Sequence, residues 1–425
     1  MTAESMLGLL IIADDLSGAA DCSAGFAQRL PTDIVFGTQD CESTAAVVAI
    51  DVDSRRLNPG EAARVNSGVL QHPQYANRAL YKKIDSTLRG NVACEIAALQ
   101  AFRGLAIVAP AFPAMGRTTQ DSVQLIDGVS VALSDVWRNE HLLGTANLLE
   151  SLIAQGLRCE AIGIDTVRDE TALANALDHA LRSDVQALIC DSVTDADLQR
   201  LAHATAALHR QLFWVGSAGL ANQLPQALGL PAPAEMNVAG RTPVLTVVGS
   251  MSRHSQAQAN RLAEQTECFC MQVDVSMLLD PAKNEQREQL LRLLQLRLAN
   301  GEDSLLTLSQ HERDPCVAAQ VSSALGDWLK PALGVTGSLI ATGGETARAI
   351  LTAAGISRLE VQGELAPGVV LSRTETGLNV VTKAGAFGHA DTLLNAWELL
   401  RASSTAVTKP SSIQPSQNKK EPHNV

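Results

Sequence analysis

Two neighbouring aspartates, Asp14 and Asp15, directly follow the apolar run Leu9–Ala13 near the start of the chain. The run predicts a buried strand, and like charges at its end are unfavourable for structure alone, because carboxylates repel one another and lose hydration when buried. One aspartate could cap the helix that follows, but a cap needs only one carboxylate. The pair therefore predicts a functional site. In it, one carboxylate would hold the hydroxyls of a polyol and the other would transfer a proton or bind a metal.

A second group of polar residues follows the apolar run at 79–83, which ends in Lys83. Asp85, Ser86 and Arg89 come directly after it, ahead of a glycine and a predicted helix. Cations can bind a carboxylate, and the acids and hydroxyls can exchange hydrogen bonds with substrate hydroxyls. This assortment indicates a site for a small polyhydroxy acid.

Two arginines extend this candidate site. Arg55 follows the predicted strand at 46–52 and could clamp a carboxylate through a two-pronged contact, or it could be a solvated surface residue. Arg117 follows a proline-containing loop after the predicted strand at 106–109. It could cover a bound ligand or bind neighbouring backbone, and the sequence leaves both roles open.

Three loops in the second half of the chain are typical of a different chemistry. Each combines glycines and hydroxyls between a predicted strand and a helix, which suits phosphate binding through backbone N–H groups. The candidate residues are Ser250, Ser252, Gly343, Gly344, Glu345, Thr346, Gly385 and Gly388. Neither GxGxxG nor GxxxxGK followed by Ser or Thr occurs at these loops, which argues against a P-loop ATPase and a standard dinucleotide fold. His254, His389 and Asp391 fit simple helix-start residues.

The elements that must position these loops alternate between short apolar runs and amphipathic stretches. This alternation predicts an α/β fold of two domains, each a mostly parallel sheet flanked by helices, with the active site in the cleft between them. Ligands in such sheets lie beyond the carboxyl ends of the strands. We expect an acid-sugar domain at 1–230, a proline-rich linker at 231–243, a nucleotide domain at 244–401 and a disordered tail at 402–425.

Composition excludes several partners. The net charge of -12 argues against nucleic acid and anionic membranes. No apolar run approaches the roughly 18 residues of a membrane span, and the N-terminus lacks the pattern of a secretory signal. The eight scattered cysteines indicate reduced thiols of a cytoplasmic protein rather than a metal or disulfide framework. The sequence leaves a homo-oligomer open.

Six separated motifs resemble those of the four-carbon acid sugar kinases, in the same order and over residues 8 to 400. They read IADDLSGAAD, KKIDSTLRGN, APAFPAMGRTT, VVGSMS, ATGGETA and TKAGAFG. The resemblance implies an ATP-dependent kinase that phosphorylates the terminal hydroxyl of a tetronate. It also implies that the N-terminal domain holds the acid and the C-terminal domain holds ATP, with Mg²⁺ expected and its ligands unassigned.

By this resemblance, Asp14, Asp15, Arg55 and the run Lys83, Ile84, Asp85, Ser86 look like the acid-sugar site, and Ser250, Ser252, Gly343 to Thr346 and Gly385 look like the ATP site. Asp15 or Asp14 would orient or deprotonate the reacting hydroxyl. The last motif departs from the family by reading Gly-Ala where a second Gly-Gly is expected. This departure leaves the roles of His389 and Asp391 unassigned.

The resemblance implies D-threonate as the first expectation for the substrate, with D-erythronate and 3-oxo-tetronate as alternatives within the same class. A non-catalytic sugar-acid sensor is the alternative from another class, but a sensor needs neither phosphate-binding loops nor paired carboxylates. A nucleotide-dependent ligase or a dehydrogenase is a third possibility, and the missing GxGxxG argues against the dehydrogenase.

Overall fold

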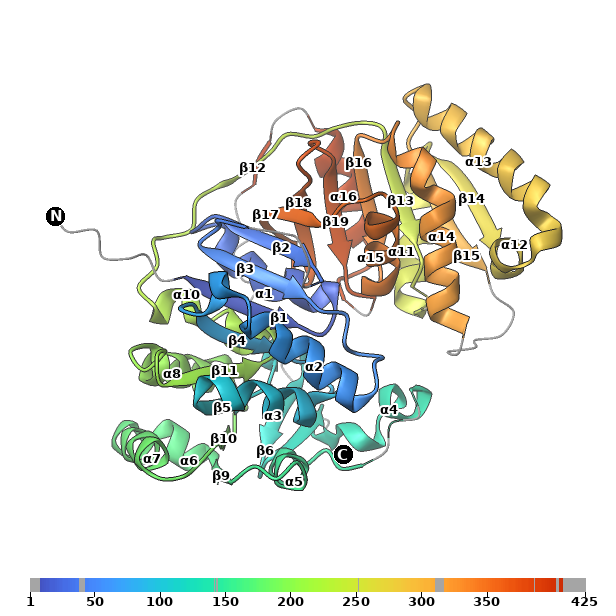
Figure 1. Ribbon diagram of the computed structural model, residues 1–425. Helices are drawn as coiled ribbons and strands as arrows, with labels where there is room; N and C mark the ends of the chain where they lie inside the picture. The colour runs from blue at the N-terminus through green and yellow to red at the C-terminus, as the bar shows by residue number, and fades with distance from the viewer. Residues whose placement is uncertain are drawn as a thin grey trace, which may run out of the picture.

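Strands and helices alternate along the whole computed structural model (Figure 1), which describes residues 8–37, 43–140, 142, 144–250, 252–309, 317–385, 387–402 and 405–407. The elements of the first half are β1 (Leu9–Ala13), α1 (Leu16–Ala27), β2 (Thr32–Phe36), β3 (Val47–Asp51), α2 (Pro59–Leu70), β4 (Ala79–Lys83), α3 (Val92–Arg103), β5 (Leu105–Ala109), β6 (Arg117–Gln120), β7 (Val123–Ile126), β8 (Val129–Ser130), α4 (Asp135–Asn139), α5 (Leu148–Ala154), β9 (Cys159–Ile162), α6 (Ile164–Arg168), α7 (Glu170–Arg182), β10 (Ala187–Cys190), α8 (Asp195–Ala206), β11 (Leu212–Gly216), α9 (Ala218–Ala221) and α10 (Leu224–Ala227).

The second half repeats this alternation. Its elements are β12 (Met236–Val238), β13 (Val244–Val248), α11 (Arg253–Gln265), β14 (Phe269–Asp274), α12 (Val275–Leu279), α13 (Asn284–Ala299), β15 (Ser304–Ser309), α14 (Ala318–Leu333), β16 (Ser338–Thr342), α15 (Gly344–Ala353), β17 (Arg358–Ala366), β18 (Val369–Arg373), β19 (Asn379–Lys383), α16 (Thr392–Arg401) and β20 (Thr405–Val407). The predicted α/β class is confirmed, and the apolar runs at 9–13, 79–83 and 244–248 coincide with β1, β4 and β13.

Eight strands of the first half form a parallel sheet in the order β2-β3-β1-β4-β11-β5-β10-β9, and β6, β7 and β8 form a separate antiparallel sheet. β1 lies between β3 and β4, so the three loops that carry the predicted acid-sugar residues leave the same edge of the sheet side by side. This arrangement is the usual location of a ligand site in an open α/β sheet.

The strands of the second half follow the same principle. β14, β15, β13, β16 and β19 are parallel neighbours in that order, followed by the antiparallel strands β18 and β17. The three glycine- and hydroxyl-rich loops leave the carboxyl ends of β13, β16 and β19, which are adjacent. The three loops predicted to bind the nucleotide therefore also converge.

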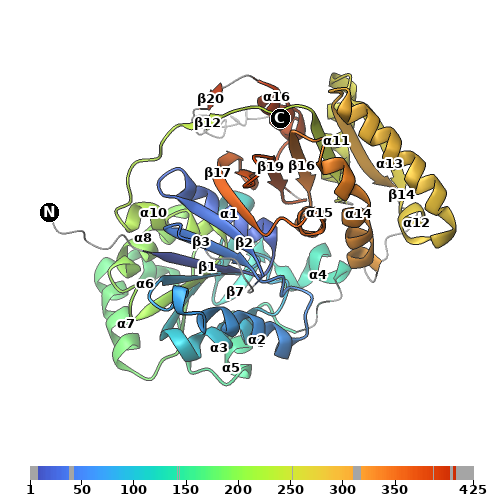
Figure 2. The ribbon, with the colours of Figure 1, turned by 45° about the horizontal axis from the view of Figure 1, so that its top comes forward.

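One strand pair joins the two halves into a continuous sheet. β17 of the second half pairs antiparallel with β2 of the first, with Arg358 opposite Val35 and Glu360 opposite Asp33. The result is a 15-stranded sheet, and Figure 2 shows β17 beside β2 where the halves meet. Nothing in the sequence predicts this pairing, because the paired segments are more than 300 residues apart along the chain.

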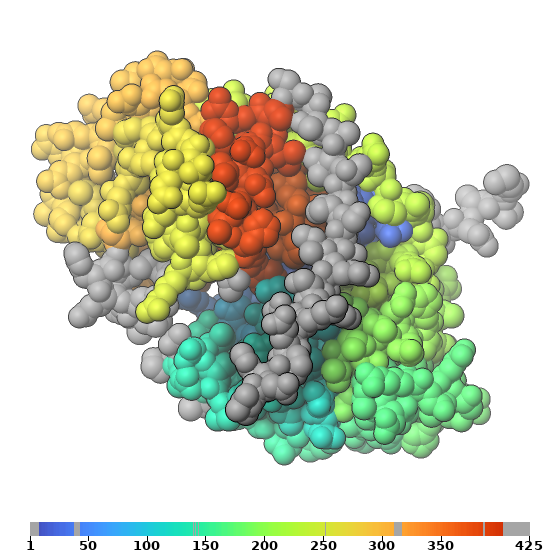
Figure 3. Space-filling model, turned by 180° about the vertical axis from the view of Figure 1, so that it is seen from behind, coloured from blue at the N-terminus to red at the C-terminus, as the bar shows by residue number. Residues whose placement is uncertain are grey.

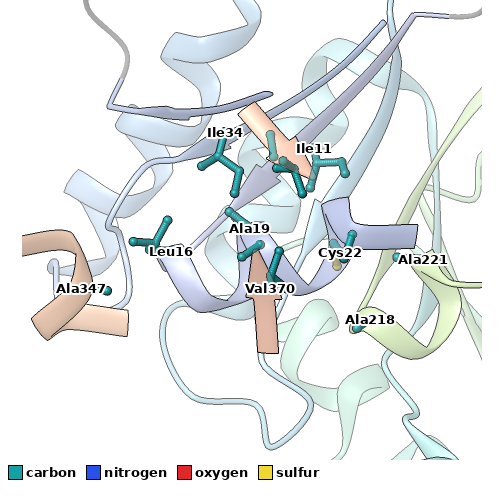
Figure 4. Close-up of a cluster of buried hydrophobic side chains, with 14 of the residues drawn as sticks. Ile11, Leu16, Ala19, Cys22, Ile34, Ala218, Ala221, Ala347 and Val370 are labelled. Carbon is teal, nitrogen blue, oxygen red and sulfur yellow. The ribbon is translucent and has the colours of Figure 1, made fainter. Parts of the chain in front are cut away.

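Helix α1 lies at the centre of the shared hydrophobic core (Figure 4). Leu16, Ala19 and Cys22 of this helix are at most 1% exposed. They belong to one cluster with Ala347 of α15 and Val370 of β18 from the second half. Because α1 begins directly after Asp15, burial of this helix between the halves also fixes the paired carboxylates.

The segments predicted as linker and tail contain short strands. Within 231–243, β12 pairs antiparallel with β20 (Thr405–Val407). The remainder of the predicted tail, 403–404 and 408–425, lies outside the described residues.

Figure 3 shows the back of the molecule, with the second half (yellow to red) above the first (cyan to green). Among the described helices, none has the length and hydropathy of a membrane span.

Candidate active site

Arg55 joins the two aspartates that follow β1. Its Nε donates to Asp14 Oδ2 at 2.7 Å and its Nη2 donates to Asp15 Oδ1 at 2.8 Å, with Asp85 Oδ2 at 3.7 Å from Nη2. The guanidinium thus neutralises the repulsion between the neighbouring carboxylates. Arg55 is therefore already engaged by protein carboxylates, which differs from the predicted free clamp for a substrate carboxylate.

The two aspartates have different surroundings. Asp15 is the N-cap of α1, since its Oδ1 accepts the N–H of Gly18 at 3.0 Å. Asp14 is only 2% exposed, and its Oδ1 has no hydrogen-bond partner among the described residues. Burial alone would raise the pKa of Asp14, but Arg55 and Lys83 outweigh it and hold the pKa below its usual value. Asp14 is thus an ionised carboxylate with one oxygen available to a ligand.

Lys83 faces the same space from the end of β4. It is 6% exposed, and a Cβ on Gly18 of α1 would lie 2.6 Å from its Nζ. No carboxylate of the described residues lies within ion-pair distance of this ammonium. Burial alone would lower the pKa of Lys83, but the surrounding acids, Asp14 foremost, raise it. Lys83 therefore carries a full positive charge that a substrate carboxylate or phosphate could neutralise.

Two further polar groups nearby lack partners. Arg117 begins β6, and its buried Nε has no hydrogen-bond partner within the described ranges. Asp21, one turn along α1, likewise has a buried and unpartnered Oδ1. Burial raises the pKa of Asp21 to about 7, while Lys83 and Arg117 lower it. Buried polar atoms without partners are rare, so Asp14, Asp21 and Arg117 together indicate space for a polar ligand.

Ile84 and Asp85, from the predicted run after β4, make structural contacts in this chain. Ile84 is 1% exposed and packs in a hydrophobic cluster with residues of α3. Asp85 holds its own loop, because it accepts hydrogen bonds from the Thr87 N–H and from Arg89. Ser86 is 7% exposed, and its carbonyl accepts from the Gln124 side chain at 2.8 Å. These residues shape the wall of the site.

The predicted nucleotide loops meet through Ser252 and Gly385. Ser252 is the N-cap of α11, and its Oγ also donates to the Gly385 carbonyl at 2.8 Å. Ser250 Oγ lies 3.2 Å from Ser252 Oγ, and a Cβ on Gly385 would lie 2.4 Å from Ser250 Oγ. Gly385 is therefore required by close packing between the loops that follow β13 and β19.

The loop after β16 leaves the start of a helix open. Gly343 is the N-cap of α15 at a φ of 91°, and no side chain caps the N–H groups of this helix. Thr346 is 5% exposed, and its Oγ1 would lie 2.1 Å from a Cβ on Gly249. An uncapped helix N-terminus lined by glycines is a ready site for phosphate oxygens.

Lys383 supports the third loop from within. This lysine is 1% exposed, and its Nζ donates to the Ala384 carbonyl at 3.0 Å and lies 3.4 Å from the Gly385 carbonyl. Burial lowers the pKa of Lys383 to about 8. Gly388, at a φ of 85°, is close to Thr392, because a Cβ on Gly388 would lie 2.5 Å from Thr392 Oγ1.

The other polar residues that the sequence analysis named in this half have structural partners. Asp391 stands at the start of α16 and pairs with Arg261 at 2.8 Å. The His389 N–H donates to Thr392 Oγ1, and the His254 ring contacts the Gly388 carbonyl. Glu345, a predicted nucleotide residue, forms an ion pair with Arg56 at 2.7 Å. Glu345 therefore links the two halves of the molecule.

The two predicted half-sites face each other directly. A Cβ on Gly344, the first residue of α15, would lie 2.7 Å from Ser17 Oγ and 2.9 Å from Asp15 Oδ2. A second contact between the halves places the Arg117 guanidinium 5.7 Å from the centre of the Phe387 ring. The start of α15, in the second half, thus lies directly against Asp15 and Ser17 of the first half.

Several residues around the site were not among those predicted from the sequence. Arg348 of α15 pairs with Asp53 at 3.1 Å and with Asp51, which fixes α15 to the loop after β3. Lys82 is fully buried beside Lys83 and pairs with Glu95 at 2.7 Å. Adjacent residues of a strand point to opposite faces, so the pair of lysines could have suggested one site residue and one support.

Two family models match the chain and cover its two halves. A sugar-binding N-terminal domain matches residues 9–224, and a nucleotide-binding C-terminal domain matches residues 245–393. A D-threonate kinase of Cupriavidus necator is 44% identical, over 93% of this chain and 98% of its own. The chain belongs to the four-carbon acid sugar kinase family.

Other members of the family are less similar. A D-threonate kinase of Bordetella bronchiseptica is 31% identical over 92% of this chain and 97% of its own. More distant members are named D-erythronate kinase, from Heliobacterium modesticaldum, and 3-oxo-tetronate kinase, from Methylobacterium radiotolerans, at 26% and 28% identity. A crystal structure from Salmonella typhimurium LT2 superposes with a TM-score of 0.78 at 21% identity, covering 92% of this chain and 99% of that one, and shares the fold.

Proposed function

We propose that the protein is an ATP-dependent kinase that transfers a phosphoryl group to the 4-hydroxyl of D-threonate. The observation that carries the proposal is the contact between the open N-terminus of α15 and Asp15. A phosphate bound at the helix start would lie beside a hydroxyl held by that carboxylate. The choice of D-threonate is supported by relatives of that name at 44% and 31% identity.

Each half of the site would supply one part of phosphoryl transfer. Lys83 and Arg117, which have no carboxylate partner among the described residues, would bind the carboxylate of the acid. Asp15 would orient or deprotonate the reacting hydroxyl, because its Oδ2 is the oxygen beside Gly344. The N–H groups at the start of α15, together with the loops at 249–252 and 384–388, would hold the phosphates of ATP. Positioning and charge neutralisation are the main needs of this reaction.

Mg²⁺ is the expected companion of ATP, since it neutralises charge on the transferred phosphoryl group. No three His, Cys, Asp or Glu side chains gather into a metal site within the described residues. Magnesium commonly keeps several waters and binds through phosphates and one or two carboxylates. Asp14 would supply such a carboxylate, because its buried Oδ1 has no hydrogen-bond partner among the described residues, which leaves Asp15 Oδ2 to the hydroxyl.

A coupled ADP-release assay with a panel of four-carbon acids tests the proposal. We expect the largest kcat/KM with D-threonate, and mass spectrometry should find a product heavier by one phosphoryl group. A larger kcat/KM with D-erythronate or a 3-oxo-tetronate would change the substrate within the same class. Tight binding of an acid without ADP release would favour the sensor.

Two further properties remain predictions, a cytoplasmic location and a homo-oligomeric state. The free thiols of Cys22 and Cys190 are in keeping with the first.

A further inference from the structure

A charged pair is buried in the hydrophobic core on the far side of β4 from the site. Lys82 is 0% exposed and Glu95 is 1% exposed, with 2.7 Å between Nζ and Oε2. The cluster around them includes Ile84, Ile96 and Leu99. Taking both ions out of water is costly, and apolar residues of similar volume often stabilise a fold equally well. Stability alone therefore does not account for this pair.

Both ions of this pair are connected by hydrogen bonds to the same hydroxyl group, that of Ser54. Glu95 Oε1 accepts a hydrogen bond from Ser54 Oγ at 2.6 Å, which is short because the acceptor is charged. Lys82 Nζ donates to Asn66 Oδ1 at 2.8 Å, and Asn66 Nδ2 donates to Ser54 Oγ at 3.3 Å. Ser54 is 0% exposed, so this hydroxyl is held from α2 and α3 at once.

Ser54 directly precedes Arg55, the residue that bridges the paired aspartates. The backbone here is also tied, since the Arg55 N–H donates to the Asp14 carbonyl at 3.3 Å and Asn91 Nδ2 donates to the Ser54 carbonyl at 3.1 Å. The backbone position of residue 55 sets how far its flexible side chain must reach to keep both carboxylate contacts, at 2.7 and 2.8 Å. A displacement of about 1 Å in a catalytic arrangement can cost about 100-fold in rate.

We propose that Lys82, Glu95 and Asn66 are positioning residues for the reaction, acting through Ser54 to place Arg55 between Asp14 and Asp15. The proposal rests on the proposed kinase function. Neighbouring residues of β4 would then have different roles on the two faces of the sheet. Lys83 faces α1 and the substrate, whereas Lys82 faces α2 and α3 and supports the loop that carries Ser54 and Arg55. The buried charges make the contact to Ser54 a strong one, and Ser54 transmits the position to the site.

Two double variants separate positioning from stability. Lys82→Met with Glu95→Leu removes the charges and the acceptor for Ser54, whereas Lys82→Met with Glu95→Gln removes the charges but keeps an acceptor oxygen. Both should keep a melting temperature near that of the wild type, because neither leaves a lone buried charge. We expect kcat/KM for the acid to fall about 10- to 100-fold in the first and much less in the second, with the KM for ATP unchanged in both.

A single hydroxyl deletion gives a milder version of the same test. Ser54→Ala should reproduce the loss of kcat/KM seen with the Leu double variant. The matched control is Ser338→Ala, which removes another fully buried hydroxyl, bonded to the Arg241 carbonyl at 2.6 Å in the other half. This control should leave the kinetics unchanged. Equal kinetics in the Leu and Gln double variants would overturn the proposal.

The position of Arg55 can also be read without any turnover. The Arg55 Nε–H donates to Asp14 Oδ2, so its signal in ¹⁵N NMR should exchange slowly with water and should disappear in Arg55→Lys, which assigns it. We expect fast exchange in Ser54→Ala and in the Leu double variant, and slow exchange in the Gln double variant. An unchanged signal in the Leu variant would refute the positioning role, whether or not any acid proves to be a substrate.

Discussion

Gly344 begins helix α15 directly against Asp15, so that a Cβ on Gly344 would lie 2.9 Å from Asp15 Oδ2. No side chain stands between the open helix start and the carboxylate. The helix belongs to the nucleotide-binding half and the aspartate to the sugar-binding half. Under the proposed function, this contact is where the phosphate donor and the acceptor hydroxyl would meet.

A methyl group at position 344 should disturb this meeting point. Gly344→Ala would force α15 or Asp15 to move, because its Cβ would lie within 3.0 Å of both Ser17 Oγ and Asp15 Oδ2. We expect kcat to fall about 10-fold or more, measured by ADP release. Gly68→Ala is the control, since a Cβ added to this glycine of α2 would meet no atom within 4 Å. The control should keep full activity and gain about 0.5–1 kcal/mol of stability.

The carboxylate of Asp15 should be needed for turnover and dispensable for ATP binding. Asp15→Asn keeps an N-cap for α1, because asparagine caps as well as aspartate does. We expect kcat to fall about 100- to 10,000-fold, as for loss of a general base. Calorimetric titration with a non-hydrolysable ATP analogue should give an unchanged Kd. Near-normal turnover would remove Asp15 from this role.

Arg117 should contribute to binding of the acid but not to binding of ATP. Arg117→Met removes a partly buried cation whose buried Nε donates no hydrogen bond within the described structure. We expect the KM for the acid to rise about 10- to 100-fold, which corresponds to the loss of a charged hydrogen bond of about 1.5–3 kcal/mol. The KM for ATP should stay constant. Arg200→Met, at a half-exposed arginine of α8, should change neither value, and a parallel rise in both KM values would contradict the assignment.

Asp21 should make stability depend on pH. Burial raises its pKa from 3.8 to about 7. The native state therefore keeps this proton between about pH 4 and 7 while the unfolded chain releases it, so the contribution of Asp21 to stability is lost as pH rises through this window. Asparagine does not ionise, so Asp21→Asn should gain stability relative to the wild type between pH 5 and pH 8. Urea unfolding at both pH values measures this, and a pH-independent difference would refute it.

Much of the candidate site can be predicted because ligand-binding loops gather at the carboxyl ends of parallel strands, and the sequence shows where several strands end. β1 and β4 have the bounds that their apolar runs predict, and the polar residues after them meet because these strands are neighbours. The same rule unites the loops after β13, β16 and β19. Runs of apolar residues set where strands end, and the parallel arrangement places all their ends at one edge.

Other features depend on contacts that local sequence does not encode. The sequence leaves Arg55 free to bind a substrate carboxylate, but three protein carboxylates surround it in the fold. Ile84 lies within a motif yet packs in the core, because alternate residues along the chain face opposite ways. The ion pair of Arg56 with Glu345 joins positions 289 residues apart. Which charged residues form ion pairs therefore depends on distant segments that come together only in the folded chain.

The pairing of β2 with β17 means that this enzyme cannot be divided as its two roles suggest. A fragment ending before β17 would expose the full edge of β2, a row of unpaired N–H and C=O groups. Such an edge recruits strands from other molecules and promotes aggregation. The half that would bind the acid and the half that would bind the nucleotide are thus separable as chemistry but joined as one folding unit, so neither half is expected to remain soluble when produced alone.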